Sequence, residues 1–424
     1  DLLPIVQREA DLAYEPEQNL DLRHRIGKLH EEHLEDVAHA VDVYREILAV
    51  MPDHAKTVEA LEGLIAAGKE AAAAAIVLEP IHDANADWEK LVRVLEVQLA
   101  AQEDAWERVK LLHRIATYYE DDRFLGNPAE AFRTYARAMH VEPRNEETLS
   151  ALERIAENLR NWQDLAVEYD KAIAATEDPA VRIIIGLRAA RVYEEDLNDV
   201  EAAIGHYNSV VAIDNRNAVA IHSLSRLFRV AQRWEDLLRI LDLEMDIAAT
   251  EEEALELKSV KAQICYSELG RVDQSLETYR EILGVNPDHG HTIATLELLF
   301  DEGVERARIF EILRPLYESA GDWEKLCAKE ETLASEAQGA EEKIEHLVSA
   351  ASIWETKLID GDKAFEYYGR AFVVDPRAER PAMELDRLAD ALGEWVKLAE
   401  LRAQVLAAAT DREIKLRPGK KLAV

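Results

Sequence analysis

Cysteine, glycine and proline are scarce in this sequence, and long apolar runs are absent. The 424 residues include two cysteines, 16 glycines and 12 prolines. Cys265 and Cys327 each lack a second cysteine nearby, so we expect buried structural thiols and neither a disulfide framework nor a metal site. The longest apolar candidate, residues 71–78, is far shorter than the ~18 residues of a membrane-spanning helix, and no signal peptide is visible. We therefore expect no membrane insertion and a cytoplasmic location.

Basic side chains are also few relative to acidic ones. Lys and Arg number 50 against 85 Asp and Glu, which gives a formal net charge of −35. A nucleic-acid binder needs a basic face to displace phosphate counterions, so we expect no nucleic-acid partner. The charge instead favours protein partners with basic surfaces. Hydrophobic residues make up 48% of the chain, which is enough for a folded core.

The motifs of common catalytic and nucleotide-binding sites are missing too. The chain has no Gly-x-Gly-x-x-Gly, no Walker loop, no Gly-x-Ser-x-Gly and no kinase motif. Acidic residues are so abundant that no single pair of carboxylates is informative. We therefore predict a protein that is not an enzyme and that needs no cofactor.

The sequence does contain two repeating ladders, and these carry most of its information. The first is Trp-x-x-Leu, with its tryptophans at Trp88, Trp162, Trp234, Trp323 and Trp395. The second is a small residue, a tyrosine four positions later and a Pro or Asn eight positions after that, with its tyrosines at Tyr44, Tyr135, Tyr207, Tyr279 and Tyr368. When Arg123 and Phe124 are treated as a two-residue insertion, both ladders step by 72 or 89 residues. Two ladders that step together indicate a repeat protein.

A longer period relates the first part of the chain to the second. Residues Tyr44–His54 recur with few changes as Tyr279–His289. We call the interval from Tyr44 to Tyr279 the long period. The segment Asp1–Leu3 matches Asp236–Leu238 at the same offset. We therefore expect the chain to begin inside a repeat block and to be a piece of a longer array.

A block of 72 residues is twice 36, close to the ~34-residue period of helix-turn-helix repeats. Apolar residues recur at helical spacing, and the period-two runs that mark strands are essentially absent. In each second helix the small residue would let neighbouring helices approach, and the tyrosine four positions on would share its face. The proline would end the helix. We expect each ladder tryptophan in the first turn of the following helix, capping a groove between hairpins.

This pattern resembles the tetratricopeptide repeat family over nearly the whole chain. The best matches to the family's second-helix signature are Ala131-x3-Tyr135-x2-Ala138-x4-Pro143 and Ala364-x3-Tyr368-x2-Ala371-x4-Pro376. The chain departs from the family because its first helices lack Trp-x2-Leu-Gly, and because the tryptophan hairpins carry Leu at the expected small position. With its long period it resembles a segment of a long bacterial array. The resemblance implies an all-α, right-handed α-solenoid of helix-turn-helix repeats that binds proteins.

The ladders also predict where the blocks begin and end. Seventeen additional residues between the Pro and the Trp of two blocks are enough for one extra helix each. The predicted division is 1–21 as the last helix of a preceding incomplete block, 22–105 as block 1 with an extra helix near 71–83, 106–179 as block 2, 180–250 as block 3, 251–340 as block 4 with an extra helix near 306–319, 341–410 as block 5, and 411–424 as a basic tail or linker.

Histidine clusters are the most tempting signs of chemistry, and we interpret them as structural. His30-Glu31-Glu32-His33 places its histidines at i and i+3, whereas a zinc protease helix needs i and i+4. We interpret it as a polar helix face. The recurring Pro-Asp-His turns are expected to supply His or Asp side chains that satisfy exposed amides at the next helix N-terminus. We predict no metal site.

Arginines in register offer one candidate ligand groove. Counting back fifteen from each small ladder residue, with the insertion allowed for, gives Arg25, Arg114, Arg188, Val260 and Ser349. Some tetratricopeptide domains clamp a ligand carboxylate with basic side chains and an asparagine four positions further on, but this chain never has Asn there. Salt bridges within the protein are therefore the preferred interpretation of the three arginines, and a ligand groove is the alternative.

Together these observations predict a non-catalytic scaffold that presents a curved, acidic repeat surface to partner proteins. The alternative is a self-assembling structural component of a larger complex or filament, in which solenoid ends stack and the protein self-associates.

Overall fold

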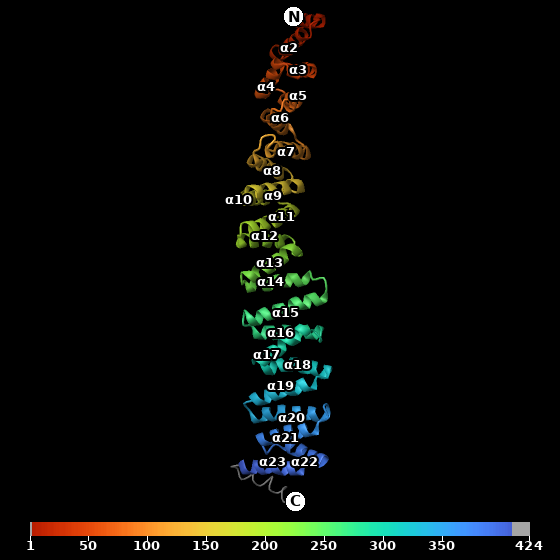
Figure 1. The fold of residues 1–424 in the computed structure, drawn as a ribbon, viewed down its shortest axis with the longest axis vertical. Helices are drawn as coiled ribbons and strands as arrows, with labels where there is room; N and C mark the ends of the chain where they lie inside the picture. The colour runs from red at the N-terminus through yellow and green to blue at the C-terminus, as the bar shows by residue number, and fades with distance from the viewer. Residues whose placement is uncertain (1, 409–424) are drawn as a thin grey trace. The chain divides into compact units, whose positions relative to one another are not determined.

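The computed structural model describes residues 2–408, and within that range it is helical throughout and contains no strand (Figure 1). It divides into two compact units, residues 1–231 and 232–424. The predicted tail, residues 411–424, lies outside the described residues. Among the described residues, no helix has both the length and the apolar character needed to cross a membrane.

The helices of the first unit follow one another through short connections (Figure 1). They are α1 (Leu3–Leu12), α2 (Pro16–Glu32), α3 (Val37–Val50), α4 (Ala55–Ala66), α5 (Ala71–Ala84), α6 (Trp88–Ala101), α7 (Ala105–Glu120), α8 (Pro128–Val141), α9 (Glu146–Leu159), α10 (Trp162–Ala175), α11 (Pro179–Arg191), the π-helical turn η1 (Val192–Asp196), α12 (Val200–Ile213) and α13 (Ala218–Val230).

The second unit continues in the same manner. Its described helices are α14 (Trp234–Asp246), α15 (Glu251–Ser267), α16 (Val272–Val285), α17 (Gly290–Glu302), α18 (Arg306–Ala320), α19 (Trp323–Glu336), α20 (Ala340–Thr356), α21 (Gly361–Val374), α22 (Glu379–Leu392) and α23 (Trp395–Ala408). Consecutive helices pack against each other within each unit, as in α7 with α8 and α20 with α21. Each unit is therefore an all-α solenoid of helical hairpins, the predicted fold class.

Polar side chains at the turns explain why the helices start where they do. A side-chain oxygen or nitrogen accepts a hydrogen bond from a backbone N–H of the first turn at ten helices. The caps are Asp36, Asp104, Asn127, Asn145, Asp178, Asp199, Asn217, Thr250, His289 and Asp360. His289 confirms the prediction that a turn histidine satisfies the next helix. His54, its counterpart one long period earlier, bonds instead to the Thr57 hydroxyl at 2.7 Å.

The second ladder forms the core of the hairpins. All five of its small residues and all five of its tyrosines are buried. In the first hairpin the Tyr44 ring packs directly against Gly27 of α2, and a Cβ at position 27 would overlap the ring. The other hairpins have Ala where α2 has Gly27. The small residue and the tyrosine thus set how closely two helices pack.

Helices α5 and α18 occupy the two segments in which the sequence predicts an extra helix. Each contains a proline inside the helix, Pro80 or Pro315, and the two prolines are related by the long period. At the start of the chain, α2 begins at Pro16, ahead of the predicted boundary at residue 22. The division between the two units falls at residue 231, inside the predicted block 180–250. The block boundaries remain predictions about the repeat.

Candidate functional site

Each ladder tryptophan is the first residue of its helix, and none of the five is fully buried. Trp395 is 50% exposed, and the other four are partly exposed. Their helices are held in the core instead by the leucine three positions later, which is at most 2% exposed in every case. The tryptophans therefore lie at the margins of the hairpins and contribute less to the core than a buried aromatic residue would.

The two-residue insertion has a packing role that sequence periodicity could not reveal. The ring of Phe124 lies 4.7 Å from that of Trp88 and 5.2 Å from that of Tyr118, edge to face in both cases. Such geometry is favourable between aromatic rings. The inserted Phe124 thus covers the tryptophan of the preceding block.

The three register arginines do not form a common ligand groove. Arg114 binds the Glu79 carboxylate at 2.6 Å, and Arg188 binds Glu153 at 2.6 Å and Glu146 at 2.5 Å. Arg25 is exposed and forms no ion pair within residues 2–408. The interpretation as internal salt bridges holds for Arg114 and Arg188, while Arg25 is free to act otherwise.

These two ion pairs belong to a wider arrangement that the sequence analysis missed. Arginines on one helix, or in the case of Arg271 directly before it, repeatedly bind a carboxylate on the element two before that helix, 32–36 residues earlier. The pairs are Arg114–Glu79, Arg154–Glu120, Arg188–Glu153, Arg226–Glu194, Arg271–Glu235, Arg308–Asp273 and Arg387–Glu355. A search for opposite charges separated by one hairpin period would have found them. They connect successive hairpins and leave those arginines satisfied from within.

The histidine cluster near the N-terminus is a packing feature. His30 is buried, which corrects the expectation of a polar helix face at that position, whereas Glu32 and His33 are exposed as expected. The ring centroid of His30 lies 4.3 Å from that of His39. Burial lowers the pKa of His30, and the neighbouring His39 adds to that effect. Within residues 2–408, no group of three or more His, Cys, Asp or Glu side chains is arranged to hold a metal ion.

Both cysteines are free thiols and are buried, as predicted. Burial raises the pKa of Cys327 to about 11 and raises that of Cys265 as well. The Cys327 Sγ donates to the Ala350 carbonyl at 3.7 Å. The thiolate form needed for nucleophilic chemistry is therefore disfavoured at both positions.

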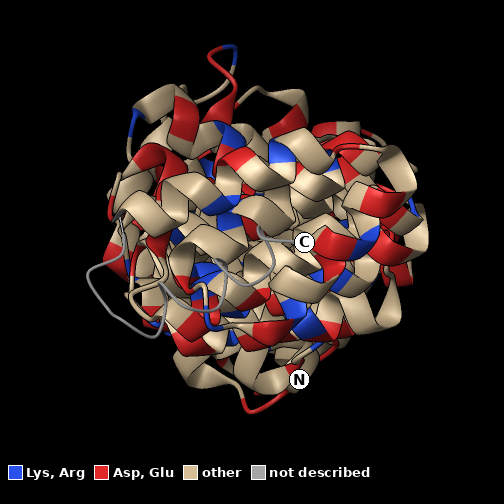
Figure 2. Ribbon diagram, turned by 90° about the horizontal axis from the view of Figure 1, so that it is seen from below, with Lys and Arg blue, Asp and Glu red and all other residues tan. Residues whose placement is uncertain are grey.

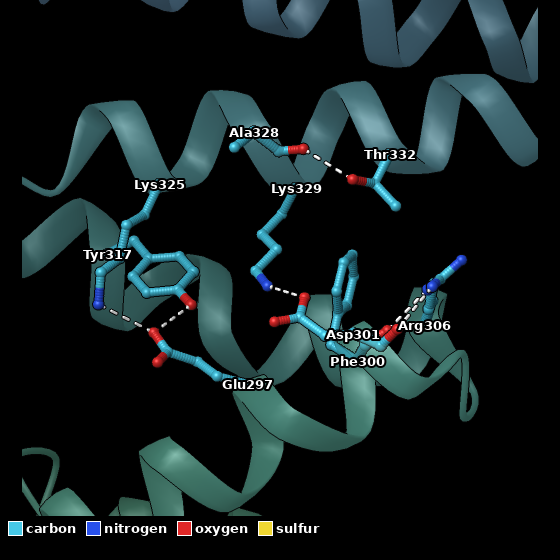
Figure 3. Close-up of polar contacts among 9 residues, drawn as sticks. All are labelled: Glu297, Phe300, Asp301, Arg306, Tyr317, Lys325, Ala328, Lys329 and Thr332. Atoms are coloured by element: carbon cyan, nitrogen blue, oxygen red, sulfur yellow. Dashed lines mark hydrogen bonds and ion pairs between the residues drawn. The ribbon is translucent and has the colours of Figure 1, made fainter.

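The extra helix α18 is fastened to its neighbours by a polar network (Figure 3). The Tyr317 hydroxyl donates to Glu297 at 2.8 Å, and Lys325 of α19 reaches the same carboxylate oxygen at 3.0 Å. At the other end of α18, Arg306 donates to the carbonyl oxygens of Phe300 at 2.6 Å and Asp301 at 2.9 Å. These bonds satisfy carbonyls at the C-terminus of α17.

Glu330 on α19 is fully buried, at 0% exposure. Its carboxylate binds Arg314 of α18, His346 Nδ1 at 2.6 Å and the Ser349 hydroxyl at 2.6 Å. A buried charge is tolerated only when such partners replace water. Arg314 remains 43% exposed, so the network links the buried carboxylate to the surface of the second unit.

An open groove of about 970 Å³ lies between α21 and α23 in the second unit, with α19 and α20 beside it. Phe365, Val373 and Leu401 supply its apolar lining. Glu366 and Glu400 also line it and form no ion pair within the described residues. An apolar surface flanked by free carboxylates suits an amphipathic segment with basic side chains.

Most cations around this groove are already engaged. Arg370 binds Glu331 at 2.6 Å, and Lys397 binds Glu394 at 2.9 Å. Lys363 lies 3.7 Å from the centre of the Trp354 ring. Figure 2 shows that acidic residues are spread over the helices and loops of the chain and that basic residues lie among them.

Comparison with known proteins finds solved structures of low similarity. No protein-family model matches it, and no curated protein matches it. The Naa15/Naa10 structure bound to HypK-THB is 15% identical with a TM-score of 0.29, covering 99% of this chain; the chain spans 66% of that structure's length. A tetratricopeptide repeat protein from Parabacteroides merdae is 17% identical with a TM-score of 0.27, covering 66% of this chain and 98% of its own.

A third similar structure is YrrB, a tetratricopeptide protein with an unusual peptide-binding site. It is 14% identical with a TM-score of 0.23, covering 52% of this chain and 97% of its own. At such values the partners of each protein remain a property of that protein. The described part of the chain is an array of helical hairpins, five of which pack through a buried small residue and tyrosine.

Proposed function

We propose that the protein is a non-catalytic scaffold that binds basic partner proteins on its acidic repeat surface. The observation that carries this proposal is that many of its arginine side chains form ion pairs within the protein. These arginines bind carboxylates of the neighbouring hairpin, 32–36 residues earlier in the chain. They are therefore largely unavailable to ligands. The formal charge of −35 leaves the acidic excess facing solvent and partners.

The groove between α21 and α23 is the proposed contact site. It offers apolar area through the exposed Val373 and free carboxylates through Glu366 and Glu400. A partner helix with leucines on one face and lysines beside them matches both features. Its apolar residues would supply affinity, and its charge would raise the rate of association at low salt.

The test uses the full chain and a defined probe. A 20-residue helical peptide of Leu and Lys is titrated by fluorescence anisotropy, and the same peptide with Glu for Lys is titrated in parallel. We expect binding of the Lys peptide only, with affinity that falls about tenfold or more as salt is raised, because screening weakens attraction between exposed charges. Equal binding of both peptides would contradict the proposal.

Matched variants show whether the groove is the site. Val373→Asp and the double change Glu366→Gln with Glu400→Gln are expected to weaken binding several-fold. Met383→Asp and Glu302→Gln are the controls, since both are exposed residues of the second unit that do not line the groove. If the controls weaken binding as much as the groove variants, the site assignment is wrong.

A further inference from the structure

Two histidines of the first unit share one buried hydroxyl group. Thr57 of α4 is fully buried, and its Oγ1 lies 3.2 Å from Nδ1 of His24 on α2. The same oxygen lies 2.7 Å from Nδ1 of His54, the residue directly before α4. The two imidazole ring centroids are 5.8 Å apart. These three side chains connect the first hairpin to the helix that follows it.

The hydroxyl group cannot serve both histidines in the same way. A hydroxyl group has one hydrogen to donate and two lone pairs, so Thr57 donates to one Nδ1 and accepts from the Nδ1–H of the other. His54 Nε2 lies 3.6 Å from the Asp21 carboxylate, which favours a hydrogen on Nε2 and leaves Nδ1 as the acceptor. His24 then donates through Nδ1–H. The hydrogen bonds thus assign different tautomers to the two rings.

This arrangement can hold one added proton but not two. When one imidazole is protonated, it donates through its Nδ1–H, and Thr57 turns its own hydrogen towards the other, neutral imidazole. When both are protonated, both rings donate to Thr57, and the hydroxyl hydrogen is left buried without an acceptor. Two positive rings at this separation also repel each other. The second proton therefore loses a buried hydrogen bond and adds charge repulsion.

The groups around the two histidines do not offset a second charge. The charged side chains that face them come from α2 and α4 and are Asp21, Lys28 and Lys56. The carboxylate of this set already binds Lys56 at 2.6 Å. From α3, the ring of Tyr44 stacks on His24, and its hydroxyl group donates to Glu31. Burial lowers the pKa of His24, and the nearby positive charges lower it further against the opposing effect of Asp21.

The second unit has the same hydroxyl group with one histidine instead of two. One long period later, His289 and Thr292 form the equivalent contact, with Nδ1 and Oγ1 2.9 Å apart. His289 Nδ1 also accepts from the Thr292 amide, and its Nε2 lies 3.5 Å from Glu256, which matches the tautomer assigned to the turn histidine of the first unit. Ser259 stands at the position of His24. The second unit therefore contains no second imidazole at this hydroxyl group.

We infer that His24, Thr57 and His54 form a pH-sensitive joint between α2 and α4, closed while at most one of the two histidines is protonated and open when both are. Protons bind to such a pair in two steps that belong to the pair and not to either residue. Because the closed joint disfavours the second proton, its contribution to the stability of the first unit is present above ~6.5, the pKa of an unfolded histidine, and is lost as the pH falls through the lower step. The joint is independent of the groove between α21 and α23.

The experiment measures amide exchange of the full chain by mass spectrometry from pH 7.5 to pH 4.5, with rates corrected for the intrinsic effect of pH. We expect exchange at residues 55–60 to accelerate about tenfold beyond that correction as the second proton binds. His24→Ser reproduces the arrangement of the second unit and should abolish the acceleration, since it leaves no second ring to repel and no competing imidazole donor. The same acceleration in His24→Ser and in the unaltered chain overturns the inference, and so does its absence from the unaltered chain.

The matched control is His33→Ser. His33 is an exposed histidine at the C-terminal end of α2 and lies outside the joint. Its removal should leave the acceleration at residues 55–60 unchanged, and circular dichroism at pH 7.5 establishes that each variant is folded. If His33→Ser abolishes the acceleration as His24→Ser does, the loss of any histidine has the same effect and the inference fails.

Nuclear magnetic resonance of the histidine rings tests the coupling itself. In the unaltered chain, labelled at histidine Cε1, the signals of His24 and His54 should each shift in two steps, because each bound proton changes the hydrogen bonds of both rings. In His24→Ser the signal of His54 should shift in one step. Independent single steps of the two histidines in the unaltered chain overturn the inference, even if amide exchange changes with pH.

Discussion

The extra helices α5 and α18 are related by the long period and are stabilised by different chemistry. Glu62, His82 and Lys90 of the first unit correspond to Glu297, Tyr317 and Lys325 of the second. The lysine–glutamate pair is kept, at 3.0 Å in both units. The third member differs, because Tyr317 donates to its carboxylate at 2.8 Å whereas His82 Nε2 lies 3.9 Å from Glu62. The same fold position thus tolerates a titratable ring in one unit and a neutral donor in the other.

A second difference concerns the charges next to these helices. In the first unit Glu79 on α5 binds Arg114 of the next hairpin, and Leu95 fills the core of α6. In the second unit the equivalent positions hold Arg314, Ser349 and the buried Glu330. The extra helix thus carries a negative charge, Glu79, in the first unit and a positive charge, Arg314, in the second. Glu79 binds a residue of the next hairpin, whereas Arg314 binds the buried Glu330 of α19. In both units the charge on the extra helix is paired with an opposite charge, but the positions that carry the two charges differ between the units.

The largest expected effect concerns the part that both regions share. Tyr44→Ala and Tyr279→Ala should each destabilise their own unit by ~3–5 kcal/mol, because both rings are almost completely buried. Trp234→Ala should cost less, about 1–2 kcal/mol, since that side chain is partly exposed. Hydrogen exchange measured for each unit during urea unfolding gives the change in the free energy of unfolding for each of the three variants. A tryptophan variant as damaging as the tyrosine variants would contradict the described burial.

The buried carboxylate should show the next largest effect. Glu330→Leu inserts the residue of the first unit but leaves Arg314 and His346 without their partner, so we expect a loss of about 3 kcal/mol in the second unit. The combined change Glu330→Leu, Arg314→Glu, His346→Leu and Ser349→Arg reproduces the arrangement of the first unit. It should recover most of the loss in urea unfolding. Stability unchanged in the single variant would show that the network is dispensable.

The pH dependence of the two units should differ at His82. Burial is the largest cause of the lowered pKa of His82, followed by repulsion from Lys90. Because the folded state holds this pKa below the ~6.5 of an unfolded histidine, its contribution to stability is present above pH 6.5 and is lost as the pH falls through the lowered value. His82→Tyr should reduce the difference in urea midpoint between pH 7.5 and 5.5.

The reciprocal change is the control for this titration. Tyr317→His should add a pH dependence to the second unit that the unaltered Tyr317 does not supply, since burial raises the pKa of that tyrosine far above this range. His24 and His113 of the first unit also have pKa values lowered by burial and provide a background that His82→Tyr leaves in place. Identical pH profiles for His82→Tyr and the unaltered chain would show that His82 does not contribute to the pH dependence of stability in the first unit.

The smallest expected effect is at the lysine that the two regions have in common. Lys90→Ala and Lys325→Ala should each change the free energy of unfolding by less than about 1 kcal/mol, because both side chains are about half exposed. Raising the salt concentration should shrink both effects. A loss well above 1 kcal/mol at either lysine, measured by urea unfolding, would show that the retained pair is more than a surface contact.

Periodicity alone predicted the helices, their approximate places and the buried small-residue and tyrosine ladder. Each of these follows from spacing along one chain: apolar residues at helical intervals, caps at the turns and a closely similar segment one long period further on. Asn145 and His289 begin α9 and α17 because their side chains can accept the first free amides, a property that is local and visible in sequence.

The partners of charged and aromatic side chains were decided only by the tertiary structure. The sequence shows Phe124 only as an insertion, whereas the structure places its ring against Trp88. The sequence places Arg25 and Arg114 at equivalent positions, but in the structure only Arg114 binds a carboxylate. The burial of Glu330 likewise depends on three other helix positions that supply its hydrogen bonds. Sequence spacing determines which face of a helix is apolar, whereas packing determines whether that face, or the charge next to it, meets another helix or remains open.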